Sequence, residues 1–410
     1  MKHTQTIQML AAAALAALSL GSASANVTYI SGSTAFEAIA DKAITNLPNA
    51  AIVGADFATF GKETNLLVKW GTGQTNFVVV HWTGSEGGNQ SATAPTNNPV
   101  TVTFFPTNAV ATGGIIPQSN STVAASTAIA FSDTDPSSSL FYHNKAGDGR
   151  YYGNAAAVSN VAVQGFAYFG STGFPATNIS AENIRSLYSS GAIPLSLITG
   201  TPSDSNNAVF AIGRNIDSGT RVVTQGVSGV GFTGTSYQYQ IITTDSPVDA
   251  QLYPVEAIDG YTNTYVGQSG YGSTGSLLGV LAATYQTGSS FDVNGDYAVS
   301  YTGSNYLVGY AAATKIPTAG TVALNYNGVA PTSANIINGS YPLWAFERVV
   351  LSPYYTNSDS STVFSSLVTY IRGLTTTQLN NGAANGNASL SDVNANLSRT
   401  TDAGVITSSH

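Results

Sequence analysis

An arginine and a Ser-Gly-Thr triplet follow one short apolar run, and together they have the chemistry of an anion site. Residues 208–212 are apolar and rich in β-branched and aromatic side chains, which is typical of a buried strand. Ser218, Gly219 and Thr220 then have the composition of a helix N-terminus, where unpaired N–H groups bind anions. Arg214 stands four residues before Ser218, so its guanidinium can reach the same anion. An ordinary capped turn with a solvated arginine fits this segment equally well.

Similar polar clusters follow other predicted strands. Ser33 and Thr34 come after residues 27–30, Ser85 comes after residues 77–82, and Asp133 comes after residues 124–131. In open parallel sheets, ligands bind at the carboxyl ends of the strands. The repeated layout therefore indicates one binding site built from several strand ends.

The intervening segments predict an α/β chain. Helical spacing of apolar residues predicts helices within 36–47, 277–285 and 363–374, and strand patterns occupy 161–169, 306–310 and 344–351. Because strands alternate with helices, substantial parallel pairing is expected. Residues 89–99 are polar and rich in turn formers, which predicts a surface loop.

The first residues have the pattern of an export signal. Lys2 and His3 precede an apolar run over residues 9–20, and Ala23-Ser24-Ala25 has the small residues of a cleavage site. We therefore expect residues 1–25 to be removed and the mature protein to be soluble and to lie outside the cytoplasm. The chain has no cysteine, which excludes disulfides and thiolate metal sites.

Charge is scarce along the whole chain. Only 8% of the residues are Asp, Glu, Lys or Arg, and the formal net charge is −8. This balance argues against nucleic acid and against anionic membranes as partners. An anion bound by this protein must be held by local groups, because the overall field repels it.

Several ordered motifs resemble the periplasmic substrate-binding proteins of phosphate ABC transporters. The Arg214-x-x-x-Ser-Gly-Thr segment resembles that family's most specific signature. Further matching landmarks, in the family's order, are Ile30-Ser31-Gly32-Ser33-Thr34-Ala35-Phe36, Thr83-Gly84-Ser85-Glu86-Gly87-Gly88, Phe131-Ser132-Asp133, Ser273-Thr274-Gly275, Val308-Gly309-Tyr310 and Gly339-Ser340-Tyr341-Pro342-Leu343.

The resemblance implies the type II periplasmic binding protein fold, with two α/β lobes joined by two crossing segments. It implies a signal peptide over 1–25, lobe 1 over 26–135 and 339–410, and lobe 2 over 136–338. It further implies a monomer that captures phosphate, or a similar small oxyanion, by lobe closure and delivers it to a membrane ABC permease. It implies a location in the periplasm, and it implies neither covalent chemistry nor a cofactor.

The resemblance also assigns roles within the site. Ser33, Thr34 and Phe36 would lie on the loop that supplies hydroxyl and backbone donors, and Ser85 would add a hydroxyl. Arg214, Ser218, Gly219 and Thr220 would complete the site from the second lobe. Asp133 would accept the proton of the bound phosphate. This carboxylate makes chemical sense, since a fully ionised sulfate would meet only repulsion there.

Other functions remain as alternatives. A secreted surface or adhesive protein could keep this fold without binding an anion, a hypothesis favoured by Glu86 inside the second loop and by the Gly/Ser/Thr/Asn-rich insertions. Phosphate-ester hydrolysis lacks metal ligands, because His3, His81, His143 and His410 form no metal-binding pattern. Residues 292–303 lack the glycine and glutamate of an EF-hand.

Overall fold

A computed structural model describes most of the chain. It covers residues 26–58, 64–117, 121–139, 152–231, 236–244, 249–254, 270–283, 304–394, 397–399, 401–402, 404 and 406–408. The predicted signal peptide, residues 1–25, lies outside the described residues, and so does the segment 292–303.

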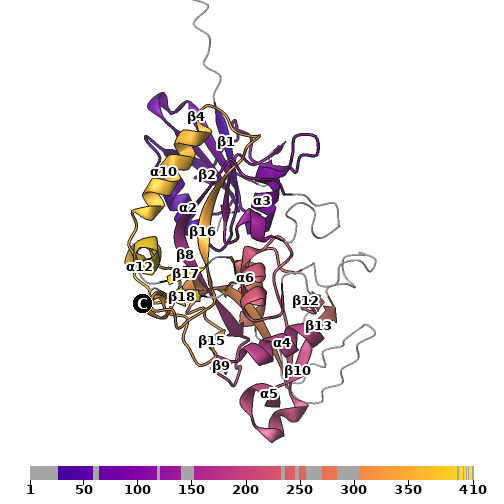
Figure 1. Ribbon diagram of the computed structural model, residues 1–410. Coiled ribbons are helices and arrows are strands. Elements are labelled where there is room, and N and C mark those ends of the chain that lie inside the picture. The colour runs from indigo at the N-terminus through magenta and orange to yellow at the C-terminus, as the bar shows by residue number, and fades with distance from the viewer. Residues whose placement is uncertain are drawn as a thin grey trace, which may run out of the picture.

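One large mixed sheet runs through the described part of the chain and joins its two lobes (Figure 1). Its strand order is β10-β11-β14-β8-β16-β7-β1-β4-β3-β2, with β15 attached to β8 and β9 attached to β15. The strands are β1 Val27–Gly32, β2 Ala51–Ala55, β3 Asn65–Trp70, β4 Asn76–His81, β7 Ile129–Ser132, β8 Ala157–Gly170, β9 Asn178–Ile179, β10 Ala192–Pro194, β11 Ala208–Ala211, β14 Asn305–Ala312, β15 Val322–Tyr326 and β16 Trp344–Leu351.

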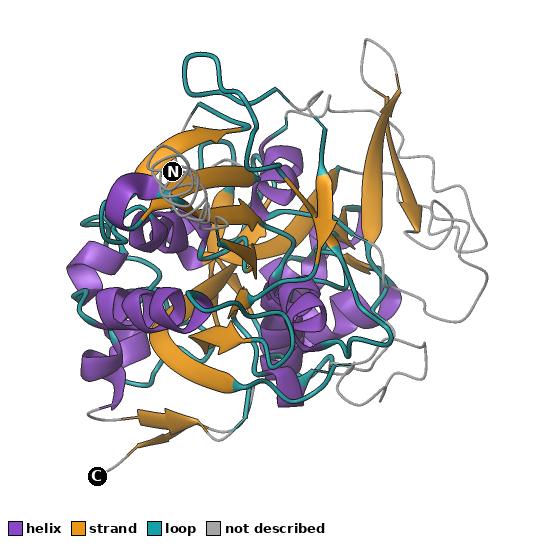
Figure 2. Ribbon diagram, turned by 90° about the horizontal axis from the view of Figure 1, so that it is seen from above, coloured by secondary structure: helices purple, strands orange, loops and turns teal. Residues whose placement is uncertain are grey.

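Helices pack on both sides of the strands (Figure 2). They are α2 Glu37–Ile44, α3 Ser85–Thr93, α4 Ala181–Ser190, α5 Ser196–Thr199, α6 Gly219–Val227, α8 Thr274–Ala282, α9 Ser333–Ile337, α10 Ser360–Arg372, α11 Thr376–Leu379 and α12 Leu390–Asn394. The described residues also contain two-stranded pairs: β5 Val102–Phe104 with β6 Val123–Ala125, β12 Tyr239–Thr244 with β13 Asp249–Pro254, and β17 Leu397–Arg399 with β18 Ile406–Ser408.

Two antiparallel strands, β8 and β16, cross from one lobe to the other. Val161 of β8 and Val349 of β16 pack in the first hydrophobic core. Farther along the same strands, Val163 and Ala345 pack in the second core. The predicted fold class is confirmed: the chain is α/β, with two lobes joined by two crossing segments.

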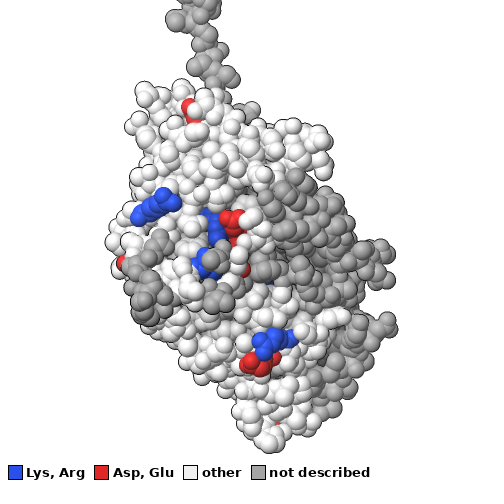
Figure 3. Space-filling view, viewed as in Figure 1, with Lys and Arg blue, Asp and Glu red and all other residues white. Residues whose placement is uncertain are grey.

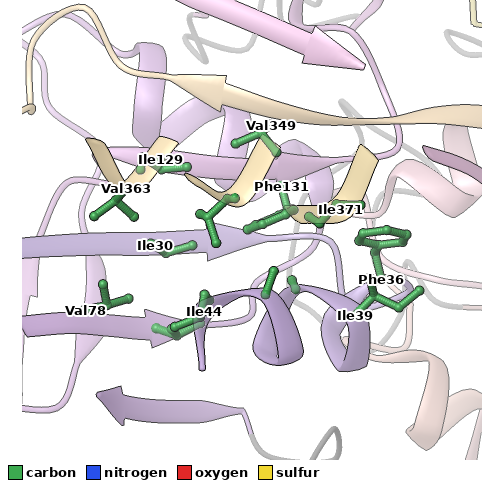
Figure 4. Packing of buried hydrophobic residues seen from close by; sticks show 14 of the residues in the cluster. Ile30, Phe36, Ile39, Ile44, Val78, Ile129, Phe131, Val349, Val363 and Ile371 are labelled. Carbon is green, nitrogen blue, oxygen red and sulfur yellow. The ribbon is translucent and has the colours of Figure 1, made fainter. Parts of the chain in front are cut away.

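The first core shows why lobe 1 folds as the periodicity predicts. The apolar face of α2 and the apolar face of α10 cover the strands that contribute Ile30, Val78 and Phe131 (Figure 4). Because β1 pairs in parallel with both β4 and β7, the three carboxyl ends emerge at one edge of the sheet. In lobe 2, β11 pairs in parallel with β14.

The predicted surface loop over residues 89–99 is wrong in its first half. Helix α3 extends to Thr93 and is largely buried. Its polar residues are satisfied by tertiary contacts that the sequence does not reveal: Asn89 donates to Ser132 Oγ at 2.9 Å, and Ser91 donates to the carbonyl of Val100 at 3.0 Å. Tertiary packing therefore overrides the low helix propensity of this segment.

The division of the chain between lobes stays a prediction. Within the segment 339–410, Leu367 packs in the first core, whereas Val393 and Leu397 pack in the second. The end of the chain therefore lies against the second core rather than wholly with the first.

Candidate functional site

The polar loops after three strands of lobe 1 are held together by backbone hydrogen bonds. The N–H of Ser33, after β1, donates to the carbonyl of Phe131 in β7 at 2.9 Å. The N–H of Gly84, after β4, donates to the carbonyl of Gly32 at 2.8 Å. Parallel pairing of β1 with its two neighbours fixes this arrangement, which is the edge where open α/β sheets bind ligands.

Asp133 lies at the centre of these loops and is fully buried. Its Oδ1 accepts a hydrogen bond from the Ser33 hydroxyl at 2.7 Å. Its Oδ2 accepts one from the Thr220 hydroxyl of lobe 2 at 3.3 Å. The backbone N–H of Asp133 donates to Ser85 Oγ at 3.1 Å. The carboxylate is thus shared between hydroxyl groups of both lobes.

Helix α6 brings its N-terminus against this cluster. Ser218 caps the helix, because its Oγ accepts a hydrogen bond from the N–H of Arg221 at 3.3 Å. A Cβ on Gly219 would lie only 2.7 Å from Ser85 Oγ and 3.0 Å from Asp133 Cβ, so only glycine allows this approach. Figure 1 shows α6 beside α3 at the junction of the lobes.

Arg214, between β11 and α6, has a fully buried side chain with several neutral partners. Its Nε donates to the carbonyl of Tyr271 at 2.9 Å, and its Nη2 donates to the carbonyl of Gly272 at 2.8 Å. The Thr274 hydroxyl accepts from Nη1 at 3.1 Å. The Thr34 hydroxyl of lobe 1 accepts from Nη2 at 3.2 Å, so the guanidinium spans the two lobes.

No carboxylate of the described residues forms an ion pair with Arg214. Burial lowers the pKa of its guanidinium to about 10, although the charges of Asp133 and Asp217 act in the opposite direction from farther away. A buried charge without a close counter-charge is costly. The site therefore holds a cation whose electrostatic compensation is incomplete.

Several donors around Asp133 and Arg214 have no acceptor within the part of the chain that the structure describes. The N–H groups of Gly219 and Thr220 have no acceptor among the described residues. The hydroxyl groups of Thr34, Ser85 and Ser218 each accept one hydrogen bond, and none of them donates to another described residue. Unused donors beside an incompletely compensated cation are the groups that an oxyanion requires.

Glu86 points away from this cluster. Its carboxyl accepts hydrogen bonds from the hydroxyl groups of Thr134, Ser139 and Tyr152. Burial is the largest cause that raises the pKa of Glu86 to about 7, and these hydroxyls oppose the rise. Glu86 therefore belongs to a separate polar cluster, which it forms with Thr134, Ser139 and Tyr152.

The structure brings most of the sequence-predicted site residues into one connected cluster. Its members are Ser33, Thr34, Ser85, Asp133, Arg214, Ser218, Gly219 and Thr220. Phe36 differs, because its N–H donates to Ser33 Oγ at 3.3 Å and its ring packs near that of Phe131 in the first core. Phe36 therefore supports the loop from the side of the first hydrophobic core.

Two residues of the cluster were not singled out from the sequence as site residues. Thr274, the first residue of α8, accepts from Arg214, and the Tyr310 hydroxyl accepts from the backbone N–H of Arg214 at 3.1 Å. Both lie in motifs that match family landmarks, so the signal was present in the sequence.

The described residues contain no group of three or more His, Cys, Asp and Glu that could hold a metal ion. None of their helices has the length and apolar character needed to cross a membrane.

No protein-family model matches this chain, and no curated protein matches it. Solved structures do. A phosphate-binding protein from Stenotrophomonas maltophilia is 15% identical with a TM-score of 0.43, covering 86% of this chain and 86% of its own. An ABC-type phosphate transport receptor from Vibrio cholerae is 13% identical with a TM-score of 0.40, covering 84% and 96%. A human phosphate binding apolipoprotein is 12% identical with a TM-score of 0.42, covering 90% and 92%. At such values these likenesses carry no argument about the site, whose chemistry follows from its own contacts.

Proposed function

We propose that this chain is an extracytoplasmic solute-binding protein that captures phosphate, or a similar small oxyanion, between its two lobes. The observation that carries the proposal is the buried Arg214 guanidinium, which contacts both lobes and lacks an ion pair within the described residues. An anion at this point would supply the missing charge and accept the unused N–H and O–H donors beside it.

Asp133 favours an oxyanion that still carries a proton. Two of its lone pairs accept the hydroxyls of Ser33 and Thr220, and an ionised carboxylate has about four lone-pair sites. A protonated phosphate can donate to one of the remaining sites. Sulfate has no proton to donate at neutral pH and would face the carboxylate directly, so the same residue that admits one anion excludes the other.

Lobe closure is the proposed binding step. The hydroxyl of Thr220 and the guanidinium of Arg214 come from lobe 2, whereas Thr34, Ser85 and Asp133 come from lobe 1. An anion that contacts both sets binds the closed form more tightly and shifts the population toward it. Charged side chains are sparse on the face shown in Figure 3, which fits recognition by a few local groups rather than by a broad field.

Export and delivery to an ABC permease complete the proposal. They are supported by the export pattern of residues 1–25 and by the motifs that resemble the phosphate transporter family. No chemical conversion of the anion is part of this role.

Calorimetry on ligand-free protein tests the proposal. The chain is unfolded in denaturant, dialysed and refolded, and is then titrated with phosphate, arsenate and sulfate. Phosphate and arsenate are expected to bind and sulfate to bind far more weakly. Arg214→Met should weaken phosphate binding at least about 30-fold, because it removes a buried charge from the complex. Arg185→Met, which removes an exposed arginine of the same lobe, is the matched control and should bind as wild type.

A folded, ligand-free protein that releases no heat with phosphate would overturn the proposal. The alternative would then be a secreted surface protein that keeps the fold without binding an anion. One observation is compatible with that alternative: the lobes already contact each other directly, since the N–H of Glu86 donates to the carbonyl of Asp217 at 2.9 Å.

A further inference from the structure

Glu347 is a second buried carboxyl beside Asp133. It belongs to the crossing strand β16 and is 0% exposed. In the antiparallel ladder of β16 with β7, Arg348 pairs with Ser132, so one further step along both strands sets Glu347 opposite Asp133. A β-bulge in the ladder with β8 lies between Glu347 and Arg348, and bulges often re-aim side chains next to functional sites.

No side chain in the described part of the chain donates a hydrogen bond to Glu347. Both oxygens of its carboxyl are buried and have no partner within normal hydrogen-bond geometry. The nearby Arg348 guanidinium is directed elsewhere, because its Nη1 donates to the carbonyls of Asp133 and Phe346 and its Nη2 to Asp402 Oδ1. An ionised carboxylate in such surroundings would be very costly.

One of the two carboxyls must carry a proton if they are to hydrogen-bond to each other. Asp133 accepts two hydroxyl hydrogen bonds and Glu347 accepts none from a side chain, so we place the proton on Glu347. Burial is the largest cause that raises the pKa of Glu347 well above its usual range, and the charge of Asp133 and the hydrogen bond between the two side chains act in the same direction. Arg348 and, as the smallest cause, the backbone N–H of Ser132 oppose the rise. The β8 neighbour of Glu347 is Ala162, which carries no charge. These surroundings favour a neutral Glu347 carboxyl next to an ionised one, a pair that forms a strong hydrogen bond when the proton points from one to the other.

We propose that Glu347 is a further specificity-determining residue of the anion site, which holds a proton against Asp133 and so keeps the pair of carboxyls at a single negative charge. This inference rests on the proposed function. Asp133 accepts two hydrogen bonds, from the hydroxyls of Ser33 and Thr220, and in this proposal the proton of Glu347 supplies the third. One lone-pair site remains for a proton of the ligand. If Glu347 ionised, two adjacent negative charges would repel any anion.

The test compares wild type with Glu347→Gln, which keeps the size of the side chain and an N–H donor but cannot ionise. Phosphate affinity is measured by calorimetry from pH 6 to pH 10, so that the ligand's own ionisation affects both proteins equally. From neutral pH to the alkaline end, the affinity of wild type should fall at least about tenfold relative to that of Glu347→Gln, the effect of an interaction worth one pKa unit. Parallel pH profiles would overturn the proposal.

Infrared spectroscopy of the unliganded proteins provides a readout that does not depend on the ligand. At pH 7 the spectrum of wild type should contain a protonated carboxylic acid band that Glu347→Gln lacks. Absence of that difference would overturn the proposal even if phosphate binds. If neither protein binds phosphate, the proposed function fails and the anion-site role of Glu347 fails with it, whereas the infrared difference still decides whether the two carboxyls share a proton.

Discussion

Two buried arginines near the crossing strands have opposite surroundings. Arg348 forms an ion pair of 2.8 Å with the buried Asp402, and Asp135 lies 3.8 Å from its Nε. Arg214 has carbonyl and hydroxyl partners but no ion pair among the described residues. Both side chains are almost inaccessible to solvent.

We use this difference to distinguish a buried charge that the protein itself balances from one that the proposed ligand would balance. Asp402 also accepts the N–H of Asp135 at 2.6 Å, so the Arg348 region ties the end of the chain to the loop that carries Asp133. Its charges are balanced within the protein. The Arg214 guanidinium has no such counter-charge among the described residues, and in the proposed function a bound anion supplies it.

The largest effect is expected when Arg348 is removed. Arg348→Met leaves Asp402 buried without its cation, so the free energy of unfolding should fall by about 3–5 kcal/mol. Urea denaturation measures this change. The double variant Arg348→Met/Asp402→Leu removes both charges and should recover a large part of the loss. A single variant as stable as wild type would show that the pair is not structural.

Glu86 belongs with Arg348 and Asp402 in this comparison. Burial is the largest cause of its raised pKa, and the charge of Asp402 adds to the rise. In the unfolded chain Glu86 ionises near pH 4.5, whereas in the folded protein its pKa is about 7. Between these values the folded state binds more protons, so stability falls as pH rises, by about 3 kcal/mol in total.

Urea denaturation from pH 4 to pH 8 tests this slope against Glu86→Gln. The variant cannot ionise and should lack the part of the pH dependence that lies between pH 4.5 and pH 7. If both proteins lose stability in parallel across this window, Glu86 is not the group responsible. The polar cluster around Glu86 would then be more hydrated than its burial indicates.

Much of the fold could be predicted because local pattern and tertiary role agree. The apolar periodicity of residues 36–47 and 363–374 is that of α2 and α10, whose buried faces form the first core. Helix α3 could not be predicted, because there the local pattern and the tertiary role disagree. Its Gly, Ser and Asn residues have low helix propensity, and partners distant in the sequence, such as Ser132 for Asn89, stabilise it.

Site residues that lie in a sequence motif could be predicted from the sequence, whereas those that only strand pairing brings to the site could not. Arg214 and Ser218 belong to the first kind, because their residue types and spacing indicate an anion site. Glu347 lies in an ordinary β-rich segment, and only the ladder between β16 and β7 places it opposite Asp133. Nor could the sequence show that the carboxyl of Glu86 bonds outside the candidate site, because its hydroxyl partners lie 48, 53 and 66 residues away in the sequence.

A smaller effect is expected at the contact between the lobes. Gly219→Ala places a Cβ 2.7 Å from Ser85 Oγ in the closed form, which should cost about 1–3 kcal/mol of strain there and weaken phosphate binding roughly ten- to hundredfold. The thermal midpoint without ligand should not fall, since the lobes can open. Gly279→Ala in α8, where a Cβ meets open space, is the matched control. Unchanged affinity in Gly219→Ala would indicate that binding does not require this contact.

The smallest effect, and the sharpest contrast with Arg348, is expected for the stability of unliganded Arg214→Met. The substitution removes hydrogen bonds to the Tyr271 and Gly272 carbonyls, which destabilises the fold, but it also removes an incompletely compensated buried charge, which stabilises it. Because the two contributions oppose each other, the free energy of unfolding should change by about 1 kcal/mol or less. Added phosphate should raise the thermal midpoint of wild type and not that of the variant, since only a bound ligand stabilises by mass action. A loss as large as that of Arg348→Met without ligand would mean that Arg214 is already balanced within the protein, and the distinction between the two arginines would then be wrong.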